Sequence, residues 1–152
     1  LLTARFADKS KNADEVISYA QQCCQDCREY VFIDELKYLA AGGRVSRTKG
    51  FFGDLLHMKP VISPMADGVK KVGMTHSRSD QLKFALNRLQ TEASPCPLVL
   101  LQYSDNRQWL EEKAYSAIRR LLPEAEIVVT PLSLTSGVHM GPGTWAVAFR
   151  GL

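Results

Sequence analysis

The sequence predicts an α/β fold in which a mixed sheet of roughly six strands is covered by helices. Short apolar runs alternate with segments whose apolar residues recur at helical spacing, which is typical of strands separated by helices. One Asp-Gly pair between two short runs predicts a β-hairpin, so the sheet contains antiparallel pairing. The chain has 152 residues, 45% of them hydrophobic, which is enough for one self-supporting core. We therefore expect a single domain over residues 1–152, and not a fibre, a disordered tail or a disulfide-stapled miniprotein.

The first elements are a helix, a strand and a short helix. Asn12 suits an N-cap and Glu15 stands in capping-box position, which predicts a helix from Ala13 to about Arg28. A buried strand is expected over Tyr30–Ile33, followed by a short helix that Asp34 caps. The first helix carries an apolar stripe that predicts a core-facing side: Val16, Ile17, Ala20, Cys23, Cys24 and Cys27.

The later elements follow the same logic. The segment from Phe51 to Met58 repeats apolar residues at helical spacing, and it fits either a core helix or the wall of a lipid pocket. In the last strand we expect Thr144, Ala146 and Ala148 to face outward. The remaining expected elements are a hairpin of Pro60–Pro64 and Val69–Met74 around Asp67-Gly68, a helix from Ser77 or Ser79 with the stripe Leu82, Ala85, Leu86 and Leu89, a strand over Pro97–Tyr103, a helix from Asn106 to Pro123, and strands over Glu126–Thr130 and Thr144–Phe149.

Charge and hydropathy exclude two classes of protein. The net charge of +3 and the pI near 8.7 are too mild for a nucleic-acid-binding face, and no basic stripe is present. The apolar runs are far shorter than the roughly 18 residues that a transmembrane helix requires. The chain begins Leu1-Leu2-Thr3 without a Met or a signal sequence, so we expect it to be a piece of a longer protein.

The cysteines allow two interpretations, a metal site and core packing. Cys23, Cys24 and Cys27 lie on the helical stripe, where cysteine behaves as a small hydrophobic residue. A zinc site needs a second pair of Cys or His residues, and the other candidates are scattered singly. We therefore favour core packing and expect no metal or cofactor. Free thiols indicate a reducing compartment, and the expected location is the cytoplasm.

A glycine pair followed by cations is the first candidate for chemistry. Gly42-Gly43 precedes Arg44, Ser46, Arg47 and Lys49. Backbone N–H groups at a helix start together with a guanidinium would suit a carboxylate or a phosphate. A helix C-cap followed by a solvated basic loop explains the same residues, and the residues alone favour it. The spacing of a P-loop is absent.

The second candidate is the glycine-rich segment Ser133–Gly143. Its glycines and a proline surround His139, which describes a backbone that approaches something closely and fixes the imidazole. A single loop histidine is more often structural or simply exposed. No Ser-His-Asp order, carboxylate pair or HExxH motif accompanies it.

Three motifs carry a resemblance to a known family. These are Leu36 to Ser46 with its Gly-Gly-Arg, Phe52 to Ile62, and Gly137 to Gly143 with His139. In this order and at these intervals they resemble the second, C-terminal domain of the DegV family. That family comprises bacterial fatty-acid-binding proteins, some of which are the acyl-carrying subunit of fatty acid kinase. The resemblance covers about Arg5 to Gly151.

The resemblance implies a fold, a ligand and site residues. The fatty acid would lie between this domain and an N-terminal domain absent from this chain, and its carboxylate would be presented to a dihydroxyacetone-kinase-like subunit. His139 would meet the carboxylate, Arg44 would lie near the carboxylate and the kinase, and the helix from Phe51 to Leu56 would line the acyl channel. The residues expected to bind ligand are Gly43, Arg44, Ser46, Phe51, Phe52, Leu55, His139 and Gly141.

Two departures from the family pattern accompany the match. Met140 replaces the usual threonine after the histidine, and Gly73 follows Val72 where an arginine is common, with Arg78 as the nearest candidate. Two other functions therefore stay open. One is an enzyme on a small phosphate or carboxylate, with Arg44 as an anion clamp and His139 as general acid or base. The other is a regulatory or interaction domain without a ligand.

Overall fold

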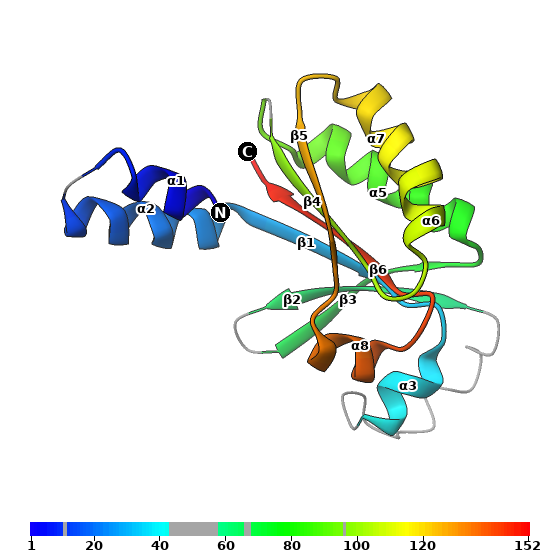
Figure 1. Ribbon diagram of the computed structural model, residues 1–152. Helices are drawn as coiled ribbons and strands as arrows, with labels where there is room; N and C mark the ends of the chain where they lie inside the picture. Colours follow the sequence, from blue (N-terminus) through cyan, green and yellow to red (C-terminus); the bar gives the residue numbers. More distant parts are fainter. Residues whose placement is uncertain (11, 43–57, 66–67, 96) are drawn as a thin grey trace.

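The computed structural model describes residues 1–10, 12–42, 58–65, 68–95 and 97–152. Its elements run from an N-terminal helical arm into a sheet covered by helices (Figure 1). In chain order they are α1 (Leu2–Ala7), α2 (Ala13–Asp26), β1 (Cys27–Phe32), α3 (Leu36–Ala41), β2 (Lys59–Met65), β3 (Gly68–Thr75), α5 (Arg78–Glu92), β4 (Leu98–Tyr103), α6 (Arg107–Trp109), the π-helix η1 (Leu110–Tyr115), α7 (Ser116–Leu121), β5 (Glu126–Pro131), α8 (Leu134–Met140) and β6 (Trp145–Arg150).

The six strands form one mixed sheet in the order β3-β2-β1-β6-β4-β5. Among the strands that the structure describes, β4 and β5 pair in parallel, and the other neighbours are antiparallel. The hairpin prediction is confirmed, because β2 pairs with β3 and Gly68 has a φ of +144° next to the turn. The predicted mixed six-stranded sheet with helices is therefore confirmed.

One face of the sheet carries the main core. Helix α5 and the continuous helical stretch α6-η1-α7 lie on this face (Figure 1). Leu110, Ala114 and Ile118 are completely buried there, as their spacing of four residues predicts. The predicted start of α5 is also confirmed, since the Ser77 hydroxyl accepts the N–H of Asp80 as an N-cap.

A buried polar chain runs through this core. The indole N–H of Trp145 donates to Oε1 of Gln81 at 3.0 Å, and Nε2 of Gln81 donates to the carbonyl of Ile33 at 3.2 Å. All three residues are 0% exposed, and the Trp145 ring stacks on Phe32 with centroids 4.2 Å apart. Gln81 joins α5 to β6 and to the residue that follows β1, a role that its position beside the predicted apolar stripe did not reveal.

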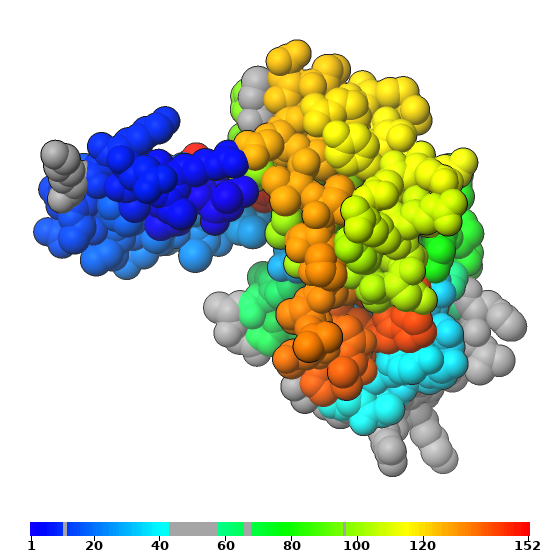
Figure 2. All heavy atoms as spheres, viewed as in Figure 1, coloured from blue at the N-terminus to red at the C-terminus, as the bar shows by residue number. Residues whose placement is uncertain are grey.

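The opposite face of the sheet is covered unevenly. Helices α3 and α8 lie side by side at one end (Figure 2). Beneath them is a small second core that includes Val31, Ile62 and Ala146. Towards the arm, cross-strand partners form a half-buried row: Glu29, Ala148, Leu100 and Val128. Burial raises the pKa of the Glu29 carboxyl, and no hydrogen bond or ion pair is found for it in the described part of the chain.

The burial of β6 corrects the sequence prediction. Thr144, just before the strand, and Ala146 were expected to face outward, yet both are 0% exposed, while Ala148 is half-buried. Strand β6 lies between β1 and β4 in the middle of the sheet. A central strand is covered on both faces wherever helices lie on both faces, so small residues there indicate packing and not exposure.

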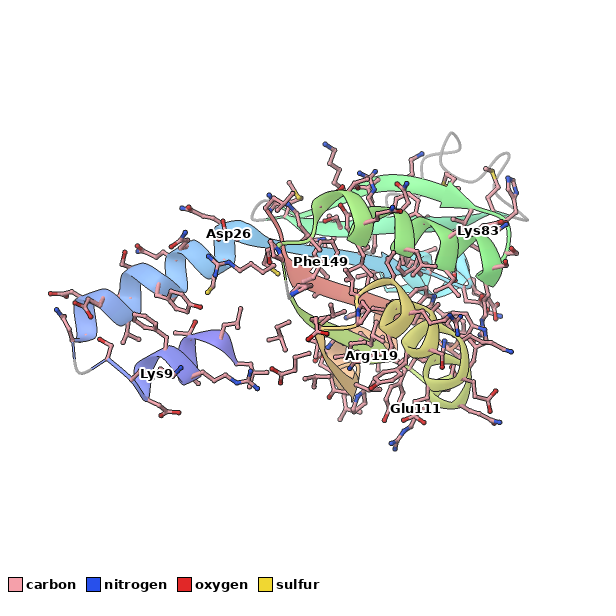
Figure 3. The ribbon with its side chains drawn as sticks, turned by 90° about the horizontal axis from the view of Figure 1, so that it is seen from above. Lys9, Asp26, Lys83, Glu111, Arg119 and Phe149 are labelled. Carbon is pink, nitrogen blue, oxygen red and sulfur yellow. The ribbon has the colours of Figure 1, made fainter. Side chains whose placement is uncertain are left out.

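Helices α1 and α2 form an arm that projects from the sheet (Figures 1 and 3). The rings of Phe6 and Tyr19 stack at 4.3 Å between the two helices. Two ion pairs fix the base of the arm: Arg5 with Glu126, at 2.6 Å for the shorter contact, and Arg150 with Asp26 at 3.0 Å. No helix was predicted over residues 2–7, because no periodic stripe marks them.

The core-facing stripe predicted for the first helix is wrong. None of the residues of α2 is buried, and Ile17 is 55% exposed. The thiols of Cys23, Cys24 and Cys27 are free, with Cys23 half-buried and the other two residues exposed. Within the described ranges no group of three or more His, Cys, Asp or Glu side chains is placed to hold a metal ion. The helix is amphipathic, but in this fold its apolar side does not pack into a core.

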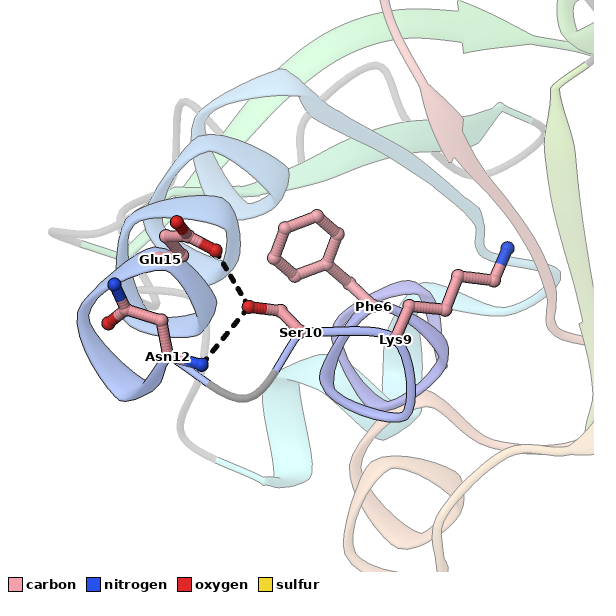
Figure 4. A pocket seen from close by; sticks show the side chains of 5 residues that line it. All are labelled: Phe6, Lys9, Ser10, Asn12 and Glu15. Carbon is pink, nitrogen blue, oxygen red and sulfur yellow. Dashed lines mark hydrogen bonds between the residues drawn. The ribbon is translucent and has the colours of Figure 1, made fainter.

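The capping of α2 agrees with the sequence only in part. Oδ1 of Asn12 accepts the N–H of Asp14 at 2.9 Å, so the N-cap is confirmed. Glu15 does not close a capping box: its carboxylate accepts a hydrogen bond from the hydroxyl of Ser10, and the Asn12 N–H donates to the same hydroxyl (Figure 4). These side chains line a shallow hollow at the tip of the arm.

No helix in the described residues is long and apolar enough to cross a bilayer.

Candidate functional site

Two of the eight predicted ligand-binding residues lie in the described part of the chain. These are His139, at the end of α8, and Gly141, immediately after it. The other six lie outside the described residues, as does all of the predicted helix from Phe51 to Met58 except Met58 itself: Gly43, Arg44, Ser46, Phe51, Phe52 and Leu55. The geometry of the site is therefore built on the C-terminal motif and on its neighbours.

The glycine-rich segment contains a helix where a fixed loop was expected. The Ser133 hydroxyl accepts the N–H of Ser136 at 3.1 Å, which caps α8. The helix places His139 in its last turn, and Gly141 then ends the helix with a φ of +80°. Glycine is the residue that adopts this conformation without strain. The segment therefore fixes the imidazole by a helix and a glycine turn together.

The two glycine motifs meet at His139. A Cβ added to Gly42 would lie 2.5 Å from Nδ1 of His139, so the imidazole rests directly on the backbone of Gly42. A Cβ at Gly141 would lie 2.2 Å from Cδ2 of Tyr38, so α3 and the turn after α8 are also in direct contact. Nδ1 of His139 is buried and has no hydrogen-bond partner among the described residues. A buried polar atom without a partner is rare in proteins and marks a candidate ligand contact.

The turn after α8 is hydrogen-bonded to two residues that follow β4. The N–H of Gly143 donates to Oδ1 of Asp105 at 2.6 Å, and Nδ2 of Asn106 donates to the carbonyl of Gly143 at 2.9 Å. The hydrogen bond from Gly143 holds the pKa of Asp105 below its ordinary value, so this carboxylate is charged at neutral pH. Asn106 was predicted to cap a helix, but its side chain makes no cap bond.

A second carboxylate, Asp34, lies on the other side of the turn. Its Oδ1 is 2.6 Å from Nζ of Lys59 and 4.0 Å from Nε of Arg78. Gly143, with a φ of +76°, packs against it so closely that a Cβ would lie 2.6 Å from Oδ2. Asp34 was predicted to cap α3, but the N-cap position is Glu35. The sequence signal for these contacts was a polar residue shortly after a strand, as at Asp34 and Asn106, and it was interpreted as a helix cap.

The two departures from the family pattern have structural outcomes. Met140 packs against the small core under α3 and α8, so its side chain serves packing in this chain. The guanidinium of Arg78 lies over the Trp109 ring at 5.4 Å and beside Asp34. Arg78 is therefore engaged within the domain, and it is a poor replacement for an arginine that faces a partner.

Comparison with known proteins decides the family. The model of the DegV family, described as uncharacterised proteins, matches residues 1–151. The chain belongs to the DegV family. A DegV domain-containing protein of Clostridium perfringens is 28% identical over 151 residues, which cover 97% of this chain and 52% of the relative. The chain thus spans about half the length of the curated DegV relatives that it matches.

Solved DegV structures share the fold. A DegV family protein from Eubacterium eligens, loaded with heptadecanoic acid, superposes with a TM-score of 0.83 at 14% identity, over 98% of this chain and 54% of that one. The fatty acid kinase B3 protein of Streptococcus pneumoniae, loaded with linoleic acid, gives 0.83 at 15% identity, over 97% of this chain and 53% of that one. Both comparisons confirm the DegV fold.

Proposed function

We propose that this DegV chain is a fatty-acid-binding domain that forms one half of its binding site and has no catalytic activity of its own. The single observation that carries the proposal is the buried, unpartnered Nδ1 of His139 on a cradle of two glycine motifs. An imidazole in such a place can donate a hydrogen bond to a carboxylate. The fatty acids named for the Eubacterium and Streptococcus structures supply the ligand class.

The uneven cover of the sheet supports a binding site shared with a second lobe. The row formed by Glu29, Ala148, Leu100 and Val128 is half-buried, although the residues on either side of it in β4 and β6, the two central strands of the row, are buried. A desolvated carboxyl at Glu29 with a raised pKa would gain a partner if another surface covered it. The length of the relatives is consistent with such a second lobe. We therefore propose an N-terminal domain as the partner across this face.

Presentation of the ligand to a kinase is the finer part of the proposal. The Streptococcus structure is named as a fatty acid kinase B3 protein, and a dihydroxyacetone-kinase-like subunit is the partner that we propose. The half-buried guanidinium of Arg78 already contacts Trp109 and Asp34, so we do not assign this residue to docking. The free thiols of α2 are consistent with a cytoplasmic location, which stays a prediction.

Acyl chains should co-purify with the complete site. We expect an organic extract of this chain, co-expressed in bacteria with the half of a DegV relative that it does not match, to contain long-chain fatty acid by mass spectrometry. The chain alone should retain much less, because an acyl tail exposed to water loses about 0.8 kcal/mol for each methylene that is not buried. Empty extracts and no oleate binding in titration, in either preparation, would refute the proposal.

Replacing His139 by Ala should weaken fatty-acid retention. Loss of a hydrogen bond to a charged carboxylate costs about 1.5–3 kcal/mol, or roughly 10- to 100-fold in affinity. Isothermal titration of the co-expressed pair with oleate measures this change. His76→Ala is the matched control, because His76 is an exposed imidazole just before α5. Equal affinity of the two variants would remove His139 from the site.

A further inference from the structure

The turn between His139 and β6 is held by side chains that follow strand β4. Asp105, the first of them, precedes its partner Gly143 by 38 residues. Asp105 accepts the N–H of Gly143, and Asn106 donates to its carbonyl. Two consecutive side chains therefore fix both backbone polar groups of one residue. Asn106 is only 8% exposed, so water cannot easily replace its bond, and a hydrogen bond in such surroundings is strong.

Further hydrogen bonds connect the turn at Gly143 to the end of α8, where His139 lies. The Thr144 hydroxyl donates to the carbonyl of Met140 at 2.9 Å, and the Gly141 N–H donates to the carbonyl of Gly137 at 2.9 Å. Between these points, Gly143 cannot move towards Asp34 because the two are already in contact. The segment from His139 to β6 thus has few degrees of freedom. A change at Gly143 must be accommodated by the last turn of α8.

We propose that Asp105 is a positioning residue for His139, acting through the Gly143 N–H with Asn106 as its partner. The two hydrogen bonds to Gly143 fix the position of the His139 imidazole relative to Gly42. They thereby fix the direction in which the ring nitrogens can contact a ligand. This inference rests on the proposed function only where it assigns the fatty-acid carboxylate to His139. The contacts from which the coupling is argued, Gly143 to Asp105 and Thr144 to the carbonyl of Met140 beside His139, do not depend on any ligand.

The test reads the imidazole directly by NMR of the ¹⁵N-labelled chain. The chain has three histidines, and loss of one ring signal in His139→Gln assigns the His139 resonances. We expect Asp105→Ala to shift or broaden them. Asp105→Asn should restore most of the wild-type signal, because its amide oxygen still accepts the Gly143 N–H although the charge is gone. A shift in Asp105→Asn as large as in Asp105→Ala would indicate a charge effect and overturn the inference.

Asp26→Ala is the matched control for a general loss of stability. Asp26 accepts two bonds from the Arg150 guanidinium at the opposite end of the sheet. Its loss should lower the Tm yet leave the His139 signals in place. If Asp105→Ala does not fold, Asp105→Ser, whose shorter side chain cannot span the same distance to Gly143, replaces it in the comparison. Unchanged His139 signals in the folded variant would refute the coupling.

Oleate titration of the co-expressed pair separates the two proposals. We expect Asp105→Ala to bind oleate about tenfold more weakly, the value of one ordinary hydrogen bond, and Asp105→Asn to bind close to the wild type. If the wild type binds no oleate while its His139 signals still respond to Asp105→Ala, the proposed function fails and the positioning role stands. Full oleate affinity in Asp105→Ala would contradict the positioning role.

Discussion

Replacing Gln81 by Met should lower the free energy of unfolding by about 2–5 kcal/mol, because two buried polar groups would lose their partners. Methionine keeps the length of the side chain, so the change removes hydrogen bonds with little loss of volume. The Trp145 indole N–H and the Ile33 carbonyl would both stay buried without a bond. In a chain of this size the expected fall in Tm is roughly 5–20 °C.

Urea unfolding and thermal denaturation measure this effect. Gln90→Met is the matched control, because Gln90 is exposed on the same helix, and it should change stability by less than about 0.5 kcal/mol. In a double-mutant cycle with Trp145→Phe, the two losses should not add, since each substitution removes the same bond. Additive losses would show that the hydrogen bond between Trp145 and Gln81 contributes nothing.

Replacing Gly141 by Ala should destabilise the domain by about 2–6 kcal/mol and displace α3 from α8. Gly141 has a φ of +80° and a ψ of 175°, a region that is nearly exclusive to glycine, and strain there costs about 1–3 kcal/mol. The added Cβ would also overlap the Tyr38 ring, with Cδ2 at 2.2 Å, and overpacking costs about another 1–3 kcal/mol. Because His139 is two residues away, ligand retention should fall with stability.

Gly137→Ala is the matched control for this prediction. Gly137 is a helical residue of α8, and a Cβ there would meet nothing within 4 Å. Alanine should therefore stabilise the domain by about 0.5–1 kcal/mol through better helix propensity. Adding Tyr38→Ala to Gly141→Ala should remove the free-energy cost of the overlap with the ring but not the cost of the backbone strain. Urea unfolding of the wild type and the three variants measures these effects, and a Gly141→Ala variant as stable as Gly137→Ala would disprove the assigned backbone strain.

Local sequence signals predicted the elements that are strongly periodic or well capped. The spacing of Leu110, Ala114 and Ile118 identified the buried side of the helix after β4, and the Asp-Gly pair identified the β2-β3 hairpin. These signals are local, because a stripe or a turn residue reports the conformation of its own segment. They also identified His139 as the fixed side chain of a glycine-rich motif.

The same kind of signal failed where the partner is distant in the chain. The stripe of α2 predicted a core, but the arm leaves Ile17 exposed. Asp34 and Asn106 have the residue types of helix caps, yet one binds Lys59 and the other holds Gly143. A polar residue after a strand gives the same sequence signal for both roles, and only the strand order brings Lys59 and Gly143 within reach.

The sequence by itself determined the α/β class, the family resemblance and the histidine of the candidate site, because periodicity and motif spacing are properties of the chain. Only the tertiary structure decided that the first half of β6 is buried on both faces, that a row including Glu29 stays partly uncovered, and that Asp105 holds the turn beyond His139. These facts depend on which strands are neighbours. Neighbourhood in a sheet is set by the packing of the whole domain, which no single segment encodes.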